Sequence, residues 1–521
     1  MAFFKTSMRE TTKQNRGMIK VIIIIIPILI LIIAGIILLK TRFFSKDSGQ
    51  DLEYGYSITT EQSFMMGFME IDKNNKFGNE IGYALELGAR GARCSIWYIK
   101  DNFEEIFTPM AELYNSGFEI IGDPRPMPPG PPANYNDYKN KLRALIRDKK
   151  DIIKYWQIGN EPDLMWQRGG YTADDFVRFF LEAAEVIRDE CSDCKIVLAG
   201  ISNQYDSSSE NYDFYEEVLE KIKKQSSDSK PFDVFDVHLY TDDGDYDRAE
   251  RAVNDYKKLL SDTGYSYDIE LVSTEFGTYS GKPKDQNILP FQSEEFQAEM
   301  LIKLYVKFFN AGVTKAFWTS VINIHKFGFE GQEGGYFDLV GLIYNGAGSY
   351  DIEHGIKKGT KKKAFYAYKT LASKVQDKTS VEEISENVFR FSNESDIVYI
   401  AWSDDKGKLP SSITGTVKVT DYLGNEKIMD ASDVVLDSSP IFIGTNLDNS
   451  GNGYNPPEED FQEGKCGDGF CDDLEKQTGL CPKDCGDLEN GSEGGAQGRC
   501  GDGICDGPIE VRNCPQDCVE R

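Results

Sequence analysis

Residues 153–200 read IKYWQIGNEPDLMWQRGGYTADDFVRFFLEAAEVIRDECSDCKIVLAG. The stretch begins with a short apolar run at 153–159, continues through a segment of helical periodicity at 173–190, and ends in a second apolar run at 195–200. Strands that alternate with helical segments of this length are typical of βα units in a parallel sheet. These residues therefore predict an α/β fold.

The same alternation extends over residues 58–376. Strand candidates in this region are 64–70, 92–98, 118–122, 153–159, 195–200, 232–240, 269–275 and 315–321, and further helix candidates are 135–150, 293–311 and 361–375. Eight units in this length match a closed (β/α)8 barrel, or TIM barrel, whose active site lies at the carboxyl ends of its strands. An open doubly wound sheet is the alternative fold, but no GxGxxG motif follows the first strand.

Beyond the helix candidate at 361–375, the apolar period changes from helical to alternating. Short strands are expected at 388–392, 397–402, 416–421 and 438–443, which predicts a small all-β sandwich over residues 377–447. Residues 448–464 are rich in glycine, asparagine, proline and acidic residues, and we expect them to form a linker.

Two copies of one cysteine pattern follow, at 465–486 and 500–518, with a linker at 487–499 between them. They contain CGDGFCDDLEKQTGLCPKDC and CGDGICDGPIEVRNCPQDC. Four cysteines in about twenty residues leave little room for a core without crosslinks. We expect two disulfides per copy, formed by Cys466, Cys471, Cys481, Cys485, Cys500, Cys505, Cys514 and Cys518. Zinc is the alternative, but the CxxxxC and CxxxC spacings are looser than typical zinc pairs.

Carboxylates lie between these cysteines, and oxygen ligands of this kind bind calcium. They are Asp468, Asp472, Glu475, Asp484, Asp502, Asp506, Glu510 and Asp517. Calcium binding and a solvated acidic surface are both open interpretations of this set. The cysteine-rich tail is also a candidate contact for a partner in the cell envelope.

The other three cysteines lie in the expected barrel. Cys191 and Cys194 stand just before the strand candidate at 195–200, at a spacing that permits a local bridge. Cys94 lies in an apolar strand candidate, and we expect it to be a buried thiol.

The N-terminal region contains the apolar run VIIIIIPILILIIAGIILL at 21–39, nineteen residues without a charge, which as a helix spans about 28 Å. A cleaved signal peptide is the alternative, but its apolar region is shorter and ends in small residues, whereas KTRF follows here. Basic residues outnumber acidic ones before the run. This bias predicts a cytoplasmic N-terminus at 1–20, a transmembrane span at 21–39, and a juxtamembrane linker at 40–57. We therefore expect a single-pass protein of the cell membrane whose later residues lie outside the cell.

The charge balance bears on possible partners. The chain of 521 residues carries 58 basic and 86 acidic residues, for a net charge of −28. Such a field repels polyphosphates and leaves neutral ligands unaffected. Nucleic acids are therefore unexpected partners.

Acidic residues stand at the expected carboxyl ends of the fourth and seventh strands. The fourth ends in IGNEPD, which includes Asn160 and Glu161, and the seventh ends in STEFG, which includes Glu275. Hydrolysis of a glycosidic bond needs one carboxyl group that protonates the leaving oxygen and one carboxylate that attacks the anomeric carbon. Alone, Glu161 could be a helix N-terminal acid and Glu275 a surface acid. Together they predict a catalytic pair.

Four further residues are candidates for substrate binding. His238 and Tyr240 are two apart in DVHLY, so both side chains lie on the same face of the sixth strand. Tyr240 could donate a hydrogen bond to Glu275, and Arg93 on the second strand could hold that carboxylate ionised. Trp318 in FWTS offers a flat apolar face for a sugar ring. The alternatives for His238 and Trp318 are packing roles in the barrel core.

These motifs resemble those of glycoside hydrolases of clan A, retaining barrel enzymes that include many cellulases and β-xylosidases. The resemblance covers about residues 60–376 and rests on GARCSIW, WQIGNEP, HLY, TEFG and FWTS in the expected strand order. It implies Glu161 as acid/base, Asn160 as a ligand of the sugar 2-hydroxyl, and Glu275 as nucleophile. Active-site roles are also implied for Arg93, His238, Tyr240 and Trp318. Many members have a histidine at the end of the third strand, where this chain reads IIGDPRPMPPG.

The sequence thus favours a membrane-anchored, outward-facing glycoside hydrolase that cleaves β-linked glycans by double displacement with retention of configuration. The expected substrate is an oligo- or polysaccharide, and catalysis is expected to need neither cofactor nor metal. Transfer to a sugar in place of water would share the same intermediate. The alternative of a different class is an inactive barrel that acts as a cell-surface carbohydrate-binding or structural protein.

Overall fold

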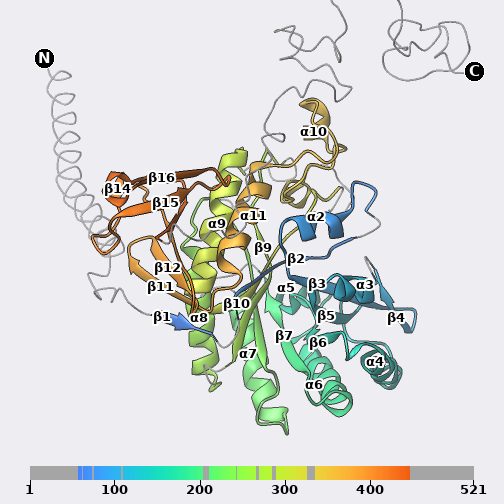
Figure 1. Cartoon of the computed structure of the whole chain (residues 1–521). Coiled ribbons are helices and arrows are strands. Elements are labelled where there is room, and N and C mark those ends of the chain that lie inside the picture. The colour runs from blue at the N-terminus through green and yellow to red at the C-terminus, as the bar shows by residue number, and fades with distance from the viewer. Residues whose placement is uncertain are drawn as a thin grey trace, which may run out of the picture. The chain divides into compact units, whose positions relative to one another are not determined.

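The computed structural model describes residues 57–445, except 61–62, 73–74, 107–108, 203–209, 242, 266–268, 284–288 and 326–334. The chain divides into two compact units, Met1–Asn449 and Ser450–Arg521. All described residues belong to the first unit, which contains a barrel and a second, antiparallel sheet (Figure 1).

Eight parallel strands form the barrel. They are β2 (Met65–Met69), β3 (Gly91–Ile99), β5 (Glu119–Pro126), β6 (Ile153–Ile158), β7 (Lys195–Ile201), β8 (Val234–Tyr240), β9 (Glu270–Gly277) and β10 (Val313–Trp318). Each strand pairs with the next in this order, and β10 pairs with β2, which closes the ring. All eight overlap the strand candidates of the sequence, so the predicted TIM barrel is confirmed. The short strand β4 (Asn102–Glu105) pairs antiparallel with β3 beyond the ring.

Helices follow most of the barrel strands. They are α2 (Glu80–Glu86), α3 (Met110–Asn115), α4 (Tyr135–Lys149), α5 (Pro162–Arg168), α6 (Ala173–Glu190), α7 (Glu210–Gln225), α8 (Arg248–Asp262), α9 (Glu294–Asn310), the 3-10 helix η1 (Tyr336–Leu339), α10 (Ser349–Glu353) and α11 (Lys363–Val375). Helices α4, α6, α9 and α11 match the helix candidates of the sequence.

Side-chain caps explain where the long helices begin. Thr172 precedes α6, and its side chain and that of Asp175 bond reciprocally to each other's backbone N–H groups in a capping box. Asn134 caps α4, and Ser293 caps α9, in each case by accepting a hydrogen bond from a backbone N–H three residues later. These caps satisfy donors that a helix leaves unpaired at its first turn.

An apolar layer fills the barrel between its two ends. Its buried members come from six different strands: Ile121, Tyr155, Val197, Val234, Val272 and Phe317. On β2 and β3 glycines stand near this layer, because a Cβ on Gly67 would lie 2.2 Å from the carbonyl oxygen of Gly91, and a Cβ on Gly91 would lie 2.4 Å from the ring of Phe317. The two glycines therefore make room for that ring at the closing seam of the barrel.

The antiparallel sheet contains seven strands. In spatial order they are β1 (Ser57–Thr59), β11 (Ser380–Ser385), β12 (Val388–Ser392), β13 (Ile397–Ala401), β18 (Ile441–Gly444), β15 (Thr416–Thr420) and β16 (Glu426–Asp430). A second small sheet consists of β14 (Gly407–Lys408) and β17 (Val435–Leu436), and η2 (Ala431–Asp433) precedes β17. These sheets agree with the predicted β domain after the barrel. Strand β1 pairs with β11, so residues 57–59 join this sheet, whereas the sequence places residue 58 in the barrel.

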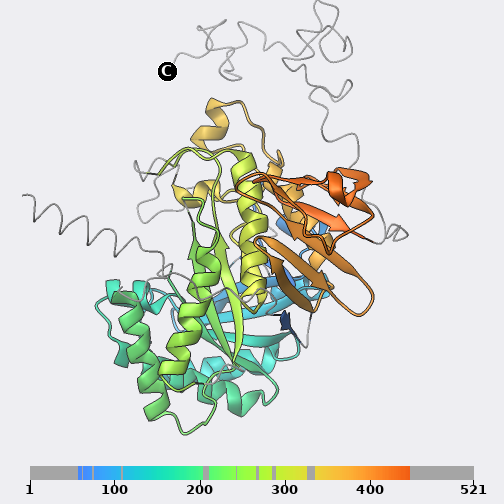
Figure 2. The same cartoon turned by 90° about the vertical axis from the view of Figure 1, so that its left-hand side faces the viewer.

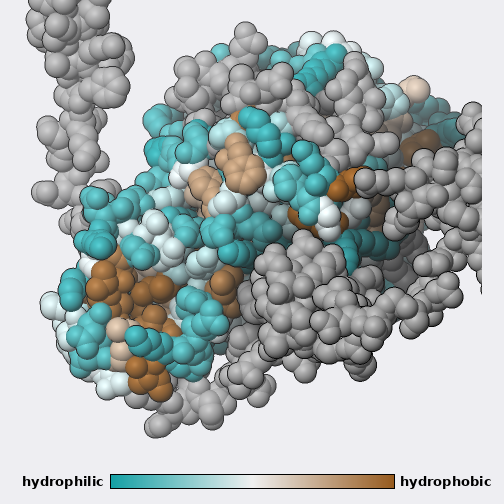
Figure 3. Space-filling view, turned by 90° about the horizontal axis from the view of Figure 1, so that it is seen from above, coloured by the Kyte–Doolittle hydropathy of each residue, from teal (hydrophilic) through white to brown (hydrophobic). Residues whose placement is uncertain are grey.

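The antiparallel sheet packs against the helix layer of the barrel. Figure 2 shows it beside α9, and the ring of Phe391 on β12 lies 5.8 Å from that of Phe64 and 6.5 Å from that of Phe309 on α9. Phe389 and Phe391 belong to the same apolar cluster as the barrel helices. The coloured part of the face in Figure 3 is largely hydrophilic, with a hydrophobic area at its lower left. The large exposed apolar side chains of the described residues lie on separate elements.

Several expectations concern residues outside the described part of the chain. These are the N-terminal tail, transmembrane span and most of the juxtamembrane linker in 1–56, and the interdomain linkers and both cysteine repeats within 446–521. No helix among the described residues has the length and apolarity that crossing a bilayer requires. Within the barrel, a disulfide joins Cys191 and Cys194, and Cys94 is a buried free thiol, as the sequence predicts.

We expect Gly91→Ala to destabilise the protein by about 2 kcal/mol or more, because the added methyl group overlaps the Phe317 ring inside a packed barrel. Chemical unfolding of the full chain measures this change. Gly444→Ala on β18 is the matched control, since the nearest atom to an added Cβ is 4.0 Å away. Equal loss of stability in both variants would contradict this account of the closing seam.

Candidate active site

Alternation along β8 carries three polar side chains toward the barrel axis. Val234 belongs to the apolar layer, so Asp236, His238 and Tyr240 follow on the same face at two-residue steps. Asp236 and His238 are almost fully buried, and Tyr240 lies at the carboxyl end of the strand. The placement of His238 and Tyr240 on one face agrees with the sequence.

An irregularity in β9 positions Glu275. Between the pairs Asp236↔Val272 and His238↔Glu275, β9 has one more residue than β8, and it also has one more residue than β10 over the same interval. A bulge of this kind redirects side chains. It allows consecutive residues to contact interior groups: Thr274 donates to Asp236, and Glu275 accepts from Tyr240.

Glu161 comes from the turn between β6 and α5. Its backbone is left-handed, with φ 40° and ψ 57°, and Pro162 follows it as the first residue of α5. This conformation is uncommon for a residue with a Cβ and is often found at functional sites. The turn brings Oε1 of Glu161 to 2.9 Å from Nδ1 of His238.

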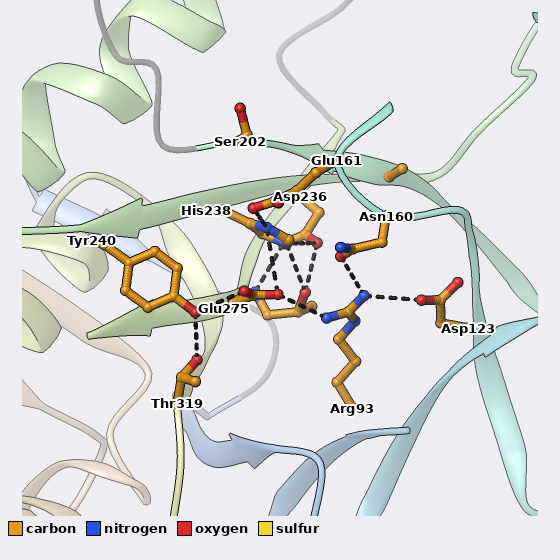
Figure 4. A network of polar contacts seen from close by, with 12 residues as sticks. Arg93, Asp123, Asn160, Glu161, Ser202, Asp236, His238, Tyr240, Glu275 and Thr319 are labelled. Carbon is orange, nitrogen blue, oxygen red and sulfur yellow. Dashed lines mark hydrogen bonds and ion pairs between the residues drawn. The ribbon is translucent and has the colours of Figure 1, made fainter. Parts of the chain in front are cut away.

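The two predicted carboxylates converge. An oxygen of Glu161, an oxygen of Glu275 and Nδ1 of His238 all lie within 4.8 Å of one another. Figure 4 shows this group at the centre of a network of polar contacts from several strands. The structure therefore brings Glu161 and Glu275 together, although 114 positions separate them in the sequence.

Glu275 is held by two donors. The hydroxyl of Tyr240 donates to Oε1 at 2.7 Å, and Nη1 of Arg93 donates to Oε2 at 3.1 Å. Arg93 is itself oriented by three other acceptors: Asp123 at 2.9 Å, Asn160 at 2.6 Å and Gln157 at 3.0 Å. These donors therefore fix the position and orientation of the Glu275 carboxylate.

The Arg93 guanidinium remains charged in the interior. Burial disfavours its charge, but Asp123 and Glu275 outweigh that effect and raise the pKa of Arg93 above its ordinary value. Because Arg93 donates to the amide oxygen of Asn160, the Asn160 nitrogen is left with its hydrogens for another acceptor. The expected placement of Arg93 and Asn160 in the site agrees with this geometry.

His238 is an imidazolium at neutral pH. Burial opposes its charge, but the charges of Asp236 and Glu275, with hydrogen bonds to Asp236 and Glu161, raise the pKa of His238 to about 10. Its two ring nitrogens therefore donate, Nδ1–H to Glu161 and Nε2–H to Asp236 at 3.0 Å. In return, although burial alone would raise the pKa of Asp236, the His238 charge lowers it.

The same atoms have a spacing that a metal ion could accept. A histidine must be neutral to offer a lone pair to a metal. Both ring nitrogens of His238 are instead hydrogen-bonded to carboxylates, Nδ1 to Glu161 and Nε2 to Asp236. The arrangement of Glu161, His238 and Glu275 therefore fits an ion-pair network better than a metal centre.

The structure corrects the expectation for Trp318. Trp318 is paired with Phe276, the residue after Glu275, so its side chain lies on the outer face of the barrel. It is fully buried against Phe276, and its indole N–H donates to the carbonyl of Val340. Thr319, one position later, reaches the site instead, with Oγ1 3.0 Å from the Tyr240 hydroxyl. A sugar cannot stack on Trp318 in this position.

Sequence reasoning assigned no role to several supporting polar residues, namely Asp123, Gln157, Asp236, Thr274 and Thr319. Two of them had a signal in the two-residue period, since Asp236 precedes His238 and Gln157 follows Tyr155 of the inner face. Asp123 lies on β5, the third barrel strand, and pairs with Arg93.

A buried carboxyl group fixes the turn that carries Glu161. Asp163 accepts from the backbone N–H of Ser202 at 3.1 Å and from its hydroxyl at 2.5 Å, which ties α5 to the end of β7. Burial raises the pKa of Asp163 to about 7, and the hydrogen bonds from Ser202 only partly oppose that rise. Asp163 thus positions the turn that carries Glu161, and no hydrogen bond joins it to Glu275 among the described residues.

A cavity of about 850 Å³ lies at the opposite end of the barrel, around the amino ends of β5, β6 and β7. Its lining includes Tyr114, Phe118, Tyr155 and Lys195. Active sites of TIM barrels lie at the carboxyl ends of the strands, where the two glutamates are. We therefore assign the chemistry to the glutamates and not to this cavity.

Comparison with known proteins concerns the fold. No protein-family model matches the chain, and no curated protein matches it. Similar solved structures include a family 39 glycoside hydrolase from the gut symbiont Bacteroides cellulosilyticus WH2, with TM-score 0.53, 12% identity, and coverage of 74% of this chain and 81% of that one. A glucosidase from Croceicoccus marinus gives TM-score 0.54, 13% identity, and coverage of 75% and 97%. The fold is that of glycoside hydrolase barrels. The resemblance inferred from the motifs is thus confirmed for the fold.

The raised pKa of His238 predicts a specific pH dependence of stability. Its folded pKa of about 10 exceeds the unfolded value of 6.5, so its stabilising contribution is complete below about pH 6.5 and is lost as the pH rises through about 10. Relative to His238→Gln, the wild type should lose up to about 5 kcal/mol of unfolding free energy over this window. Urea unfolding of both proteins from pH 6 to 10 measures the difference, and parallel curves would contradict it.

Proposed function

We propose that this protein is a retaining glycoside hydrolase that cleaves β-linked glycans, with Glu275 as nucleophile and Glu161 as acid/base. The observation that carries the proposal is the approach of a Glu161 oxygen to within 4.8 Å of a Glu275 oxygen at the carboxyl end of the barrel. Retaining enzymes have carboxyl groups about 5–5.5 Å apart, whereas inverting enzymes leave room for a water molecule at about 6.5–9.5 Å.

Hydrogen bonding supports the division of roles. Both oxygens of Glu275 accept hydrogen bonds, from Tyr240 and Arg93, which fix the orientation of this carboxylate for attack. Of the two carboxylate oxygens of Glu161, Oε1 accepts a hydrogen bond from His238, whereas Oε2 accepts none from a side chain of the described residues. Oε2 of Glu161 is therefore the oxygen through which a proton would pass to the leaving group.

The reaction would proceed in two displacements. Protonated Glu161 gives its proton to the glycosidic oxygen while a Glu275 oxygen bonds to the anomeric carbon, so the leaving group departs as an alcohol. Ionised Glu161 then takes a proton from water, whose oxygen attacks the same carbon and releases Glu275. The Asn160 amide, oriented by Arg93, would donate to a sugar hydroxyl. An acceptor sugar in place of water would give transglycosylation by the same route.

We expect Glu275→Gln to lower kcat on aryl β-glycosides by about 1000-fold or more, because the amide cannot form the glycosyl intermediate. Glu161→Gln should affect a 4-methylphenyl glycoside much more than a 2,4-dinitrophenyl glycoside in the first step, because only the poorer leaving group needs a proton. Steady-state and burst kinetics of the full chain measure both effects.

Glu185→Gln is the control, since Glu185 is an exposed acid on α6 that pairs with Lys139. The anomer released first, followed by NMR, should keep the β configuration. Turnover that survives both active-site changes, or no turnover on any glycoside, would favour the alternative of a carbohydrate-binding or structural barrel.

We also propose that the barrel is displayed outside the cell on a single transmembrane helix at 21–39. The uncharged apolar run and the basic residues before it support this topology. An oxidising exterior is consistent with the Cys191–Cys194 disulfide. In this proposal the cysteine-rich tail carries four more disulfides. The same segment is the proposed site for calcium, on its carboxylates, and for contact with a cell-envelope partner.

If residues 21–39 span the membrane, the full chain should stay in the membrane fraction after an alkaline wash. The double variant Leu29→Lys with Ile33→Lys should be released, because charges at the centre of a span cost about 3 kcal/mol each. Five disulfides would leave one thiol, Cys94, among eleven cysteines. Maleimide labelling of the denatured wild type should therefore add one label before reduction and eleven after it. Nine labels before reduction would contradict the crosslinked tail.

A further inference from the structure

With Trp318 on the outer face of the barrel, the site needs another apolar surface if it is to hold a sugar ring. Sugar rings present C–H bonds on their faces, and sites that bind them combine polar groups with aromatic surfaces. On one side Glu275 bonds to Arg93, whose other partners there, Asp123 and Asn160, are also polar. On the other side, Tyr240 is followed by further aromatic rings.

Phe337 is one of the partly exposed members of this aromatic group, and it packs against Tyr240. Its ring lies 5.1 Å from that of Tyr240, at an angle of 87°. The hydroxyl of Tyr240 in turn donates to Glu275. Tyr336 and Leu339, which share η1 with Phe337, are buried, whereas Phe337 and Tyr240 are only partly buried. The two rings thus form an aromatic corner beside the proposed nucleophile.

The segment that carries Phe337 is fixed on both sides. Before it, the Tyr336 hydroxyl donates to the carbonyls of Thr241 and Gly277, at the ends of β8 and β9. After it, Nζ of the buried Lys362 donates to the carbonyl of Leu339 at 2.8 Å. A surface held in this way loses little conformational entropy when a ligand binds to it.

Two further bonds extend this support and give Trp318 a structural role. The carbonyl of Val340 accepts from the indole N–H of Trp318 at 3.1 Å and from the side-chain amide of Gln297 at 3.0 Å. Trp318, on the outer face of β10, therefore supports the segment that contains η1 and Val340. Within this segment, the ring of Phe337 is partly exposed.

We propose that Phe337 is the aromatic platform on which one face of the sugar stacks beside Glu275. This assignment rests on the proposed glycosidase function and adds a substrate-positioning residue to it. Stacking contributes to binding of the ground state and the transition state alike, so its loss appears in KM and Kd and leaves kcat nearly unchanged.

The test compares Phe337→Ala and Phe337→Tyr in the full chain. With 4-nitrophenyl β-D-glucopyranoside and β-D-xylopyranoside, Phe337→Ala should raise KM about threefold to tenfold and change kcat less than about twofold. Phe337→Tyr retains the ring and should behave like the wild type. Tyr114→Ala is the matched control, because Tyr114 is an exposed aromatic residue at the opposite end of the barrel.

Calorimetry separates this proposal from the proposed function. Cellobiose and xylobiose are titrated into Glu275→Gln and into the same variant with Phe337→Ala, which should bind about threefold to tenfold more weakly. If the wild type turns over no glycoside but this difference in binding persists, the glycosidase function fails and the platform stands. Unchanged KM and Kd in Phe337→Ala, a large loss of kcat in both Phe337 variants, or no binding of either disaccharide would overturn the platform.

Discussion

The guanidinium of Arg93 is the group on which the polar interior of the barrel depends. It is almost fully buried, and its donors reach Gln157, Asp123, Asn160 and Glu275, which come from three other strands or their ends. A charge in the interior without partners would cost several kcal/mol, so these acceptors and Arg93 require one another. Removal of the guanidinium would leave Asp123 and Glu275 without their shared cation and would release the amide of Asn160.

Acids outnumber cations around this point. Two buried cations, Arg93 and His238, face four buried acids, Asp123, Asp236, Glu161 and Glu275. With all four acids ionised the group carries two excess negative charges, and uptake of one proton brings it closer to neutrality. His238 and Arg93 hold their own protons, since the pKa of each is raised. The two cations therefore stay charged beside the four acids.

Much of this arrangement was predictable from the sequence because it follows from regular alternation. The strand ends locate Glu161 and Glu275, and the two-residue period aligns His238 with Tyr240. The error at Trp318 was one of face: Phe317 belongs to the inner layer and Thr319 reaches the site, so Trp318 between them points outward. The extra residue on β9, which positions Glu275, is visible only in the pairing of three strands. Likewise, the three residues of β1 carry no pattern that assigns them to the second sheet.

That short strand has a mechanical consequence. Residues 57–59 lie before the first barrel strand but bond to β11 of the antiparallel sheet, which also contains β18, the last strand of the described chain. Tension on the backbone from either direction thus reaches this one sheet before it reaches the barrel. A pulling force on the chain would therefore separate strands of this sheet first, while the spacing of the two glutamates stays unchanged.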